Sequence, residues 1–193
     1  MEMNDQYWSE RYLTNNSGWD IGAPSTPIKT YIDQLSNKSV SILIPGGGNS
    51  YEAAYLSEQG FTYVTIADIS AVVYNKLTEQ YAGIDAIKII HDDFFKLQGQ
   101  YDLVLEQTFF CALDPSLRKA YVSKMYELLK PGGKLAGVLF NRAFPGGPPF
   151  GGSKDEYLEL FSGEFDIAIM EDCYNSIPKR AGAELFIKLI RRN

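Results

Sequence analysis

Short apolar runs alternate with segments whose apolar residues recur every three to four positions, from residue 40 to the end of the chain. A continuous apolar run bounded by glycine or proline is typical of a buried strand, and the wider spacing is typical of an amphipathic helix. This alternation predicts an α/β fold, a doubly wound, mostly parallel sheet with helices on both faces. Seven strands are expected, at residues 42–44, 61–67, 86–90, 101–105, 134–140, 165–170 and 184–190.

Residues 1–39 precede the first strand and carry two expected helices, one from Asp5 to Leu13 and one with Thr26 as its N-cap and Pro27 as its first residue. The stretch between them is a loop by composition. Trp8 and Trp19 there are either core residues or parts of a lid over a ligand, and the pattern favours neither. We predict one domain over residues 1–193, with an N-terminal helical lid region at 1–39 and the core at 40–193.

The stretch VSILIPGGGNSYE, residues 40–52, combines a buried strand, a glycine turn and a helix start. Gly46–Gly48 permit a sharp turn and a close approach of the backbone to a ligand. Asn49 is an expected N-cap, and Glu52 would complete a capping box. This order of elements predicts a cradle of the nucleotide-binding kind.

Asp68 ends the second predicted strand, 20 positions after Gly48. An acid at the carboxyl end of this strand can accept hydrogen bonds from a ribose diol. The pair predicts an adenosine-containing cofactor. The third glycine of the dinucleotide fingerprint is absent, and the sequence has Ser50 and Tyr51 there instead, so the residues alone leave the identity of that cofactor open.

Asp93 and Phe94 follow the third predicted strand. There an acid and an apolar side chain could hold the edge and the face of an adenine. Alternatively, Asp92 and Asp93 only cap the following turn. His91 is the one histidine of the chain, and we interpret it as a strand-end residue rather than a general base. One histidine and scattered acids do not form a ligand set, so no metal is expected.

Charge and cysteine content narrow the classes of partner. The net charge of −6 argues against a nucleic-acid partner. Cys111 and Cys173 form no disulfide framework, and the polar, acidic N-terminus is unlike a signal peptide. No apolar run reaches membrane length. We therefore expect a cytoplasmic protein, monomeric or weakly homo-oligomeric, that acts on a small molecule and has no membrane partner.

Several blocks together resemble the class I S-adenosylmethionine-dependent methyltransferases, and more narrowly the thiopurine, halide and thiol methyltransferase family. The most distinctive is EQTFFCALDPSLR at 106–118. The others are GWDIG at 18–22, ILIPGGGNSYEAAYL at 42–56, ADIS at 67–70, DDFF at 92–95, ELLKPGG at 127–133, GGPPF at 146–150 and NSIPKRAGAE at 175–184. The resemblance implies the Rossmann-like methyltransferase fold and S-adenosyl-L-methionine as methyl donor.

The resemblance also assigns residues to the two halves of the site. The cofactor contacts expected are Trp19, Gly46, Gly48, Asp68, Ile69, Asp93, Phe94, Glu106 and Gln107. The acceptor side would be lined or covered by Trp8, Trp19, Phe110, Arg118 and Arg180. Arg118 could equally form an ion pair on a helix surface. The family usually has PGCGxGxD and an aspartate at the place of Glu106, so this chain departs from it at both points.

Methyl transfer from a sulfonium needs little acid–base assistance, because the donor is already activated and the protein mainly aligns the reactants. No nucleophile–base arrangement is visible, so no catalytic side chain is assigned. We expect transfer to a small acceptor, a thiol, a thiopurine-like sulfur or a halide, in a pocket lined by Phe109, Phe110 and Phe150. The alternatives are a regulatory protein that binds S-adenosylmethionine without turnover and a nicotinamide-dependent oxidoreductase.

Overall fold

The computed structural model describes residues 3–193, whose strands form one sheet in the order β3-β2-β1-β4-β5-β7-β6. The strands are β1 (Ile42–Pro45), β2 (Val64–Asp68), β3 (Ile87–His91), β4 (Tyr101–Gln107), β5 (Leu129–Phe140), β6 (Phe165–Asp172) and β7 (Glu184–Arg191). The pairs among β1 to β5 are parallel, whereas β7 is antiparallel to both β5 and β6. The prediction of a mostly parallel seven-stranded sheet is confirmed.

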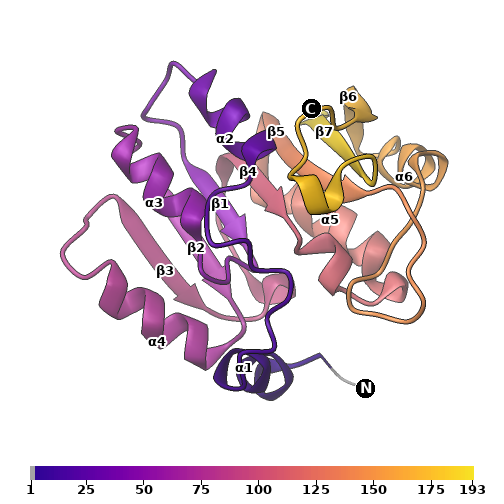
Figure 1. The fold of residues 1–193 in the computed structure, drawn as a ribbon. Coiled ribbons are helices and arrows are strands. Elements are labelled where there is room, and N and C mark those ends of the chain that lie inside the picture. Colours follow the sequence, from indigo (N-terminus) through magenta and orange to yellow (C-terminus); the bar gives the residue numbers. More distant parts are fainter. Residues whose placement is uncertain (1–2) are drawn as a thin grey trace.

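Helices cover both faces of this sheet (Figure 1). The α-helices are α1 (Asp5–Leu13), α2 (Thr26–Asp33), α3 (Tyr51–Glu58), α4 (Ala71–Gln80), α5 (Arg118–Leu128) and α6 (Lys154–Phe161). Short 3₁₀ turns follow or join them: η1 (Phe94–Lys96), η2 (Phe110–Ala112), η3 (Pro115–Leu117) and η4 (Pro178–Arg180). One core cluster contains side chains of α2, α3 and α4, and the other contains side chains of α5 and α6.

The central strand β1 shows why the apolar runs are continuous. Ile42 and Ile44 belong to the core cluster under α2, α3 and α4, while Leu43 belongs to the opposite cluster. Successive side chains of a strand point to opposite faces, so a strand covered on both sides has no polar position. Full burial of each such side chain is worth about 1.5–3 kcal/mol relative to exposure.

The helix α2 is part of this core rather than of a lid. Ile28 and Ile32 have no exposed surface and pack in the cluster with β1. The helix begins at Thr26 with Ser25 as its N-cap, one residue earlier than expected. The part of the chain that could move as a lid therefore lies N-terminal to Ser25.

Two expectations about helix starts are wrong. Ser50, not Asn49, is the N-cap of α3, and its φ of 50° lies in the left-handed region. The Asn49 side chain instead bonds Asp20 and Lys76, and Glu52 accepts from the amide of Ser25 rather than closing a capping box. The sequence also predicts a helix that begins at Asp114 and Pro115 and carries Leu117 inward. In the structure Leu117 belongs to η3, which precedes α5, and its side chain is exposed.

Candidate cofactor and acceptor site

Four parallel strands end at the same edge of the sheet, and their ends carry most of the predicted site. The glycine loop follows β1, Asp68 ends β2, His91 ends β3 and Gln107 ends β4. Because β1 lies between β2 and β4, these ends are neighbours. Ligands of doubly wound sheets bind at this edge, where the strand order reverses.

The glycine loop and Asp68 form the best-defined part of the site. One carboxylate oxygen of Asp68 accepts from the Gly48 amide at 3.0 Å, and the other accepts from the Ser70 amide at 2.8 Å. Asp68 is buried, and this burial raises the pKa of its carboxyl against the effect of the two amides. Gly46 and Gly48 have φ angles of 57° and 52°, which a glycine adopts without strain.

A bulkier residue would not fit at two positions of the loop. A Cβ atom on Gly46 would overlap the Phe109 ring, and one on Gly48 would lie 2.7 Å from the Tyr12 hydroxyl. The backbone of the loop therefore stays uncovered by side chains of its own, which suits the close approach of a nucleoside. The expected placement of Gly46, Gly48 and Asp68 around one cradle fits an adenosine-containing cofactor.

The helix α1 is anchored beside this cradle at the start of α4. The Asp5 carboxylate accepts from the Ala71 amide at 2.8 Å, and the Ser9 and Ser70 hydroxyls are 2.9 Å apart. Ser70 donates its own amide to Asp68, so hydrogen-bonded residues connect helix α1 to the Asp68 carboxylate. In Figure 1, α1 lies next to α4, and the segment after it runs past the strand ends to α2.

Aromatic rings connect α1 to the loop that follows it. Trp19 makes edge-to-face contacts with Trp8 and with Tyr12, at centroid distances of 5.7 and 5.8 Å. Burial and the neighbouring Asp68 carboxylate raise the pKa of the Tyr12 phenol. Trp8 and Trp19 thus belong to one cluster, next to the glycine loop, in which Tyr12 lies against Gly48.

The segment from Trp19 to Ser25 is tied to the rest of the fold at three points, in η4, in α3 and at the end of β4. The Arg180 guanidinium donates to the Trp19 carbonyl at 2.8 Å. The Ser25 amide donates to the Glu52 carboxylate at 3.0 Å, and its hydroxyl donates to the Gln107 amide oxygen at 2.9 Å. Since Gln107 ends β4, the segment from Trp19 to Ser25 passes over the carboxyl edge of the sheet.

At the end of β3, Asp93 caps η1 by accepting from the Phe95 amide at 3.0 Å. Phe94 is buried and contacts the Phe109 ring at a centroid distance of 5.0 Å. His91 stacks on Tyr74 and lies 3.0 Å from the Ile69 carbonyl oxygen. The capping role of Asp93 is present, and its contact with adenine, like those of Ile69 and Phe94, stays a prediction.

Glu106 has no exposed surface at all, unlike the other expected cofactor contacts. One of its oxygens accepts from the amides of Phe109 and Phe110, and the other accepts from the Tyr121 hydroxyl. Burial raises the pKa of this carboxyl to about 7. The side chain faces the interior of the chain, so a direct cofactor contact is not its evident role.

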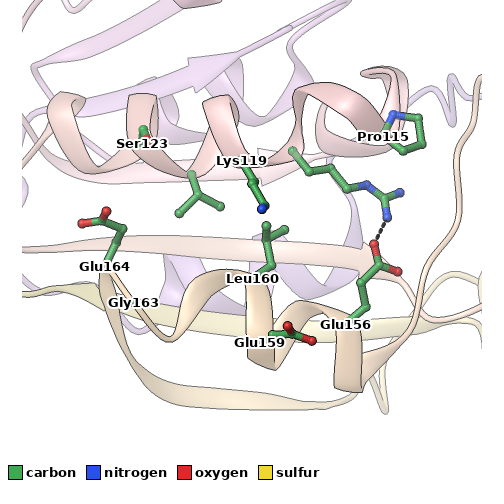
Figure 2. A pocket seen from close by; sticks show the side chains of 10 residues that line it. Pro115, Lys119, Ser123, Glu156, Glu159, Leu160, Gly163 and Glu164 are labelled. Atoms are coloured by element: carbon green, nitrogen blue, oxygen red, sulfur yellow. Dashed lines mark hydrogen bonds and ion pairs between the residues drawn. The ribbon is translucent and has the colours of Figure 1, made fainter.

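Phe110 and Arg118, expected on the acceptor side, lie in the packing between α5 and α6. The Phe110 ring contacts Tyr121 and Tyr157. Arg118 is buried, forms an ion pair with Glu156 and donates to the Gly151 carbonyl at 2.6 Å. The dashed line at Glu156 in Figure 2 marks this pair, beside a groove of about 540 Å³ between the two helices. The geometry favours the ion-pair alternative for Arg118.

We expect Arg118→Ala to lower the free energy of unfolding by about 2–4 kcal/mol, because Glu156 and the Gly151 carbonyl lose a buried partner. Lys119→Ala, an exposed neighbour on α5, is the matched control and should change stability by less than about 0.5 kcal/mol. Urea unfolding measures both. A raised acceptor KM for Arg118→Ala at unchanged stability would return this residue to the acceptor pocket.

Within residues 3–193, no three His, Cys, Asp or Glu side chains gather in a way that could hold a metal ion. No helix of the same range is long and apolar enough to cross a bilayer.

Comparison with known proteins identifies the family. A profile of the thiopurine S-methyltransferase family matches residues 3–186. The chain belongs to this family. The predictions of an S-adenosylmethionine-dependent methyltransferase and of its methyl donor are thereby confirmed, and the nicotinamide alternative is excluded.

Individual members of the family and one solved structure are similar over most of their length. A probable thiol methyltransferase 2 of Arabidopsis thaliana is 30% identical over 161 residues, 79% of this chain and 70% of that protein. A thiocyanate methyltransferase 1 of Brassica oleracea is 28% identical over 92% of this chain and 81% of its own. A Burkholderia thailandensis 1,6-didemethyltoxoflavin-N1-methyltransferase shares the fold, with a TM-score of 0.78, 18% identity and coverage of 98% and 87%.

Sequence reasoning missed four residues that organise the site: Asp5, Ser9, Tyr12 and Ser25. Each acts on a partner at least 27 positions away, so no local pattern reveals it. Tyr12 had one weak signal, its spacing of four from Trp8 on a predicted helix.

Proposed function

We propose that this methyltransferase acts on sulfur or halide acceptors at the carboxyl edge of the sheet, under the segment that contains Trp19. The hydrogen bond between Gly48 and Asp68, at the centre of that edge, is the observation that carries the placement. The similarity to a probable thiol methyltransferase and to a thiocyanate methyltransferase supports the acceptor class.

In this proposal the cofactor-binding residues are Trp19, Gly46, Gly48, Asp68, Ile69, Asp93, Phe94 and Gln107. S-adenosylmethionine supplies an activated methyl group on a sulfonium sulfur. Asp68 would accept from the ribose hydroxyls, since its carboxylate lies directly behind Gly48. Ile69 and Phe94 would flank the adenine, and Gln107 would present its amide N–H groups, because its oxygen already accepts from Ser25.

On the acceptor side we propose Trp8, Trp19, Phe109 and Arg180. Arg180 is mostly buried and lies 3.5 Å from the carboxylate of Glu184, the first residue of β7. Because it also donates to the Trp19 carbonyl, Arg180 connects the segment that contains Trp19 to β7. The carboxylates of Glu52 and Glu106 near this edge are buried, and each already accepts a hydrogen bond from a backbone amide. The chain would therefore contribute alignment and exclusion of water rather than a general base.

A panel of acceptors tests the proposal. We expect turnover of bisulfide, an aromatic thiol or iodide, because these nucleophiles need little or no deprotonation at neutral pH. An amine and a catechol, which need a base, should react at least about 100-fold more slowly. Methyl transfer from S-adenosylmethionine is measured by formation of S-adenosylhomocysteine. Turnover of the amine or catechol alone would contradict the acceptor class, and no turnover of any acceptor would favour a regulatory protein.

We also propose that residues 3–22 close over the cofactor, because helix α1 has no fully buried residue and its anchors to the start of α4, through Asp5 and Ser9, are polar. Hydrogen exchange in α1 should slow about tenfold or more when S-adenosylhomocysteine is added, since binding suppresses local opening. Helix α6, packed on the other face, is the internal control and should be unchanged. Equal protection of α1 with and without the ligand would make the segment a fixed part of the core.

The remaining expectations about partners complete the proposal. A net charge of −6 supports a small-molecule acceptor rather than a nucleic acid. Two buried, unpaired cysteines support a reducing, cytoplasmic setting. We propose that the protein is a monomer or a weak homo-oligomer. It would need no metal and have no membrane partner.

A further inference from the structure

The turn after β4, residues 107–111, places several side chains of the site at once. Gln107 reaches Ser25 in the N-terminal segment, and the Phe109 ring lies against Gly46 of the glycine loop. Thr108 has a φ of 59°, a left-handed conformation that is unfavourable for a β-branched residue. Something in the chain must hold this turn in its strained form.

The Glu106 carboxylate is the group that holds it. A single oxygen accepts from the Phe109 amide at 2.8 Å and from the Phe110 amide at 2.9 Å, so two successive N–H groups converge on one atom. That convergence requires the chain to reverse at Thr108. The Tyr121 hydroxyl donates to the second oxygen at 2.7 Å and fixes the carboxylate from α5.

The neighbouring strand makes room for this arrangement. Gly137 of β5 is paired with Glu106, and a Cβ atom at Gly137 would overlap both the backbone and the Cβ atom of Glu106. The titratable side chains around the carboxylate are Tyr121 and Cys111, both buried, and burial raises the pKa of each. No cation of residues 3–193 forms an ion pair with Glu106.

We propose that Glu106 is a positioning residue, which shapes the 107–111 turn through its hydrogen bonds and so sets cofactor affinity without touching the cofactor. The proposal rests on the proposed function in one respect, that the cofactor binds beside Gly46 and Gln107. It reassigns Glu106 from the group of direct cofactor contacts. What matters is an acceptor oxygen at this position, not a negative charge.

Two substitutions separate positioning from contact. Glu106→Gln keeps the acceptor oxygen for both amides and removes the charge, so the Kd for S-adenosylhomocysteine should stay within about threefold of the wild-type value. Glu106→Leu fills a similar volume without an acceptor, which releases the turn and should raise the Kd about tenfold or more. Exchange of the Phe109 and Phe110 amides should accelerate in the leucine variant alone.

Met170→Ala on the edge strand β6 serves as the control for a general loss of stability, because Met170 is buried and the strands β5 and β7 lie between β6 and β4. It should leave the Kd unchanged. Equal losses for Glu106→Gln and Glu106→Leu would show a direct charged contact and overturn the proposal, as would wild-type affinity in the leucine variant. If Glu106→Leu does not fold, the amide exchange and Kd of Glu106→Gln decide. A wild-type protein that binds no S-adenosylhomocysteine would refute the proposed site instead.

Discussion

Asp68→Ala should lower the affinity for S-adenosylhomocysteine by about 10- to 100-fold, which corresponds to the loss of about 1–3 kcal/mol. The carboxylate has two roles in the structure, because it accepts from Gly48 and Ser70 and also offers the acceptor expected for a ribose diol. Removal of both oxygens frees the Gly48 amide and loosens the cradle itself. Calorimetric titration measures the change directly.

Asp68→Asn and Asp85→Ala sharpen the experiment. The asparagine keeps one acceptor oxygen, so its affinity should lie between those of the wild type and the alanine variant. Asp85 is an exposed acid in the loop between α4 and β3, and its replacement removes one charge without touching the site. Unchanged affinity in Asp68→Ala, or an equal loss in Asp85→Ala, would contradict the assignment of the cradle.

The second large effect is on stability as a function of pH. The pKa of Glu106 is raised by burial from 4.5 to about 7, so the folded chain holds a proton there that the unfolded chain releases. Stability from this group is fully present below pH 4.5 and is lost as the pH rises to about 7. The wild type should therefore be more stable at pH 5.5 than at pH 8, by up to about 1–2 kcal/mol from Glu106.

Glu106→Gln isolates this contribution, because an amide does not titrate in the range. Urea unfolding at pH 5.5 and pH 8 should show a smaller difference in the variant than in the wild type. Glu79→Gln, an exposed acid on α4, is the matched control and should retain the wild-type difference. A variant whose pH dependence equals that of the wild type would show that Glu106 is ionised in the folded chain throughout the range.

The sequence predicted the strands, the sheet type and the cradle because their causes are local. A buried strand needs a continuous apolar run, and a tight turn at Gly46 and Gly48 needs positive φ angles, so both leave a mark in neighbouring residues. Asp68 was found in the same way, since it directly ends the strand β2.

The errors have tertiary causes. Asn49 has the composition of an N-cap, but its side chain serves Asp20, which is 29 positions earlier, and Ser50 takes the cap in a left-handed conformation. The orientation of Glu106 depends on Tyr121 and on space opposite Gly137, neither of which a motif shows. Arg118 likewise meets Glu156 only after α5 and α6 have packed together.

The most direct test of the account is a crystal structure of the protein with S-adenosylhomocysteine. We predict that the ribose hydroxyls lie within hydrogen-bond distance of Asp68, with the adenine near Ile69 and Phe94 and the chain from Trp8 to Trp19 above the ligand. Glu106 should keep its bonds to the Phe109 and Phe110 amides and make no contact with the ligand. A ligand bound in the groove between α5 and α6, or one that leaves Asp68 without a contact, would contradict the proposed site.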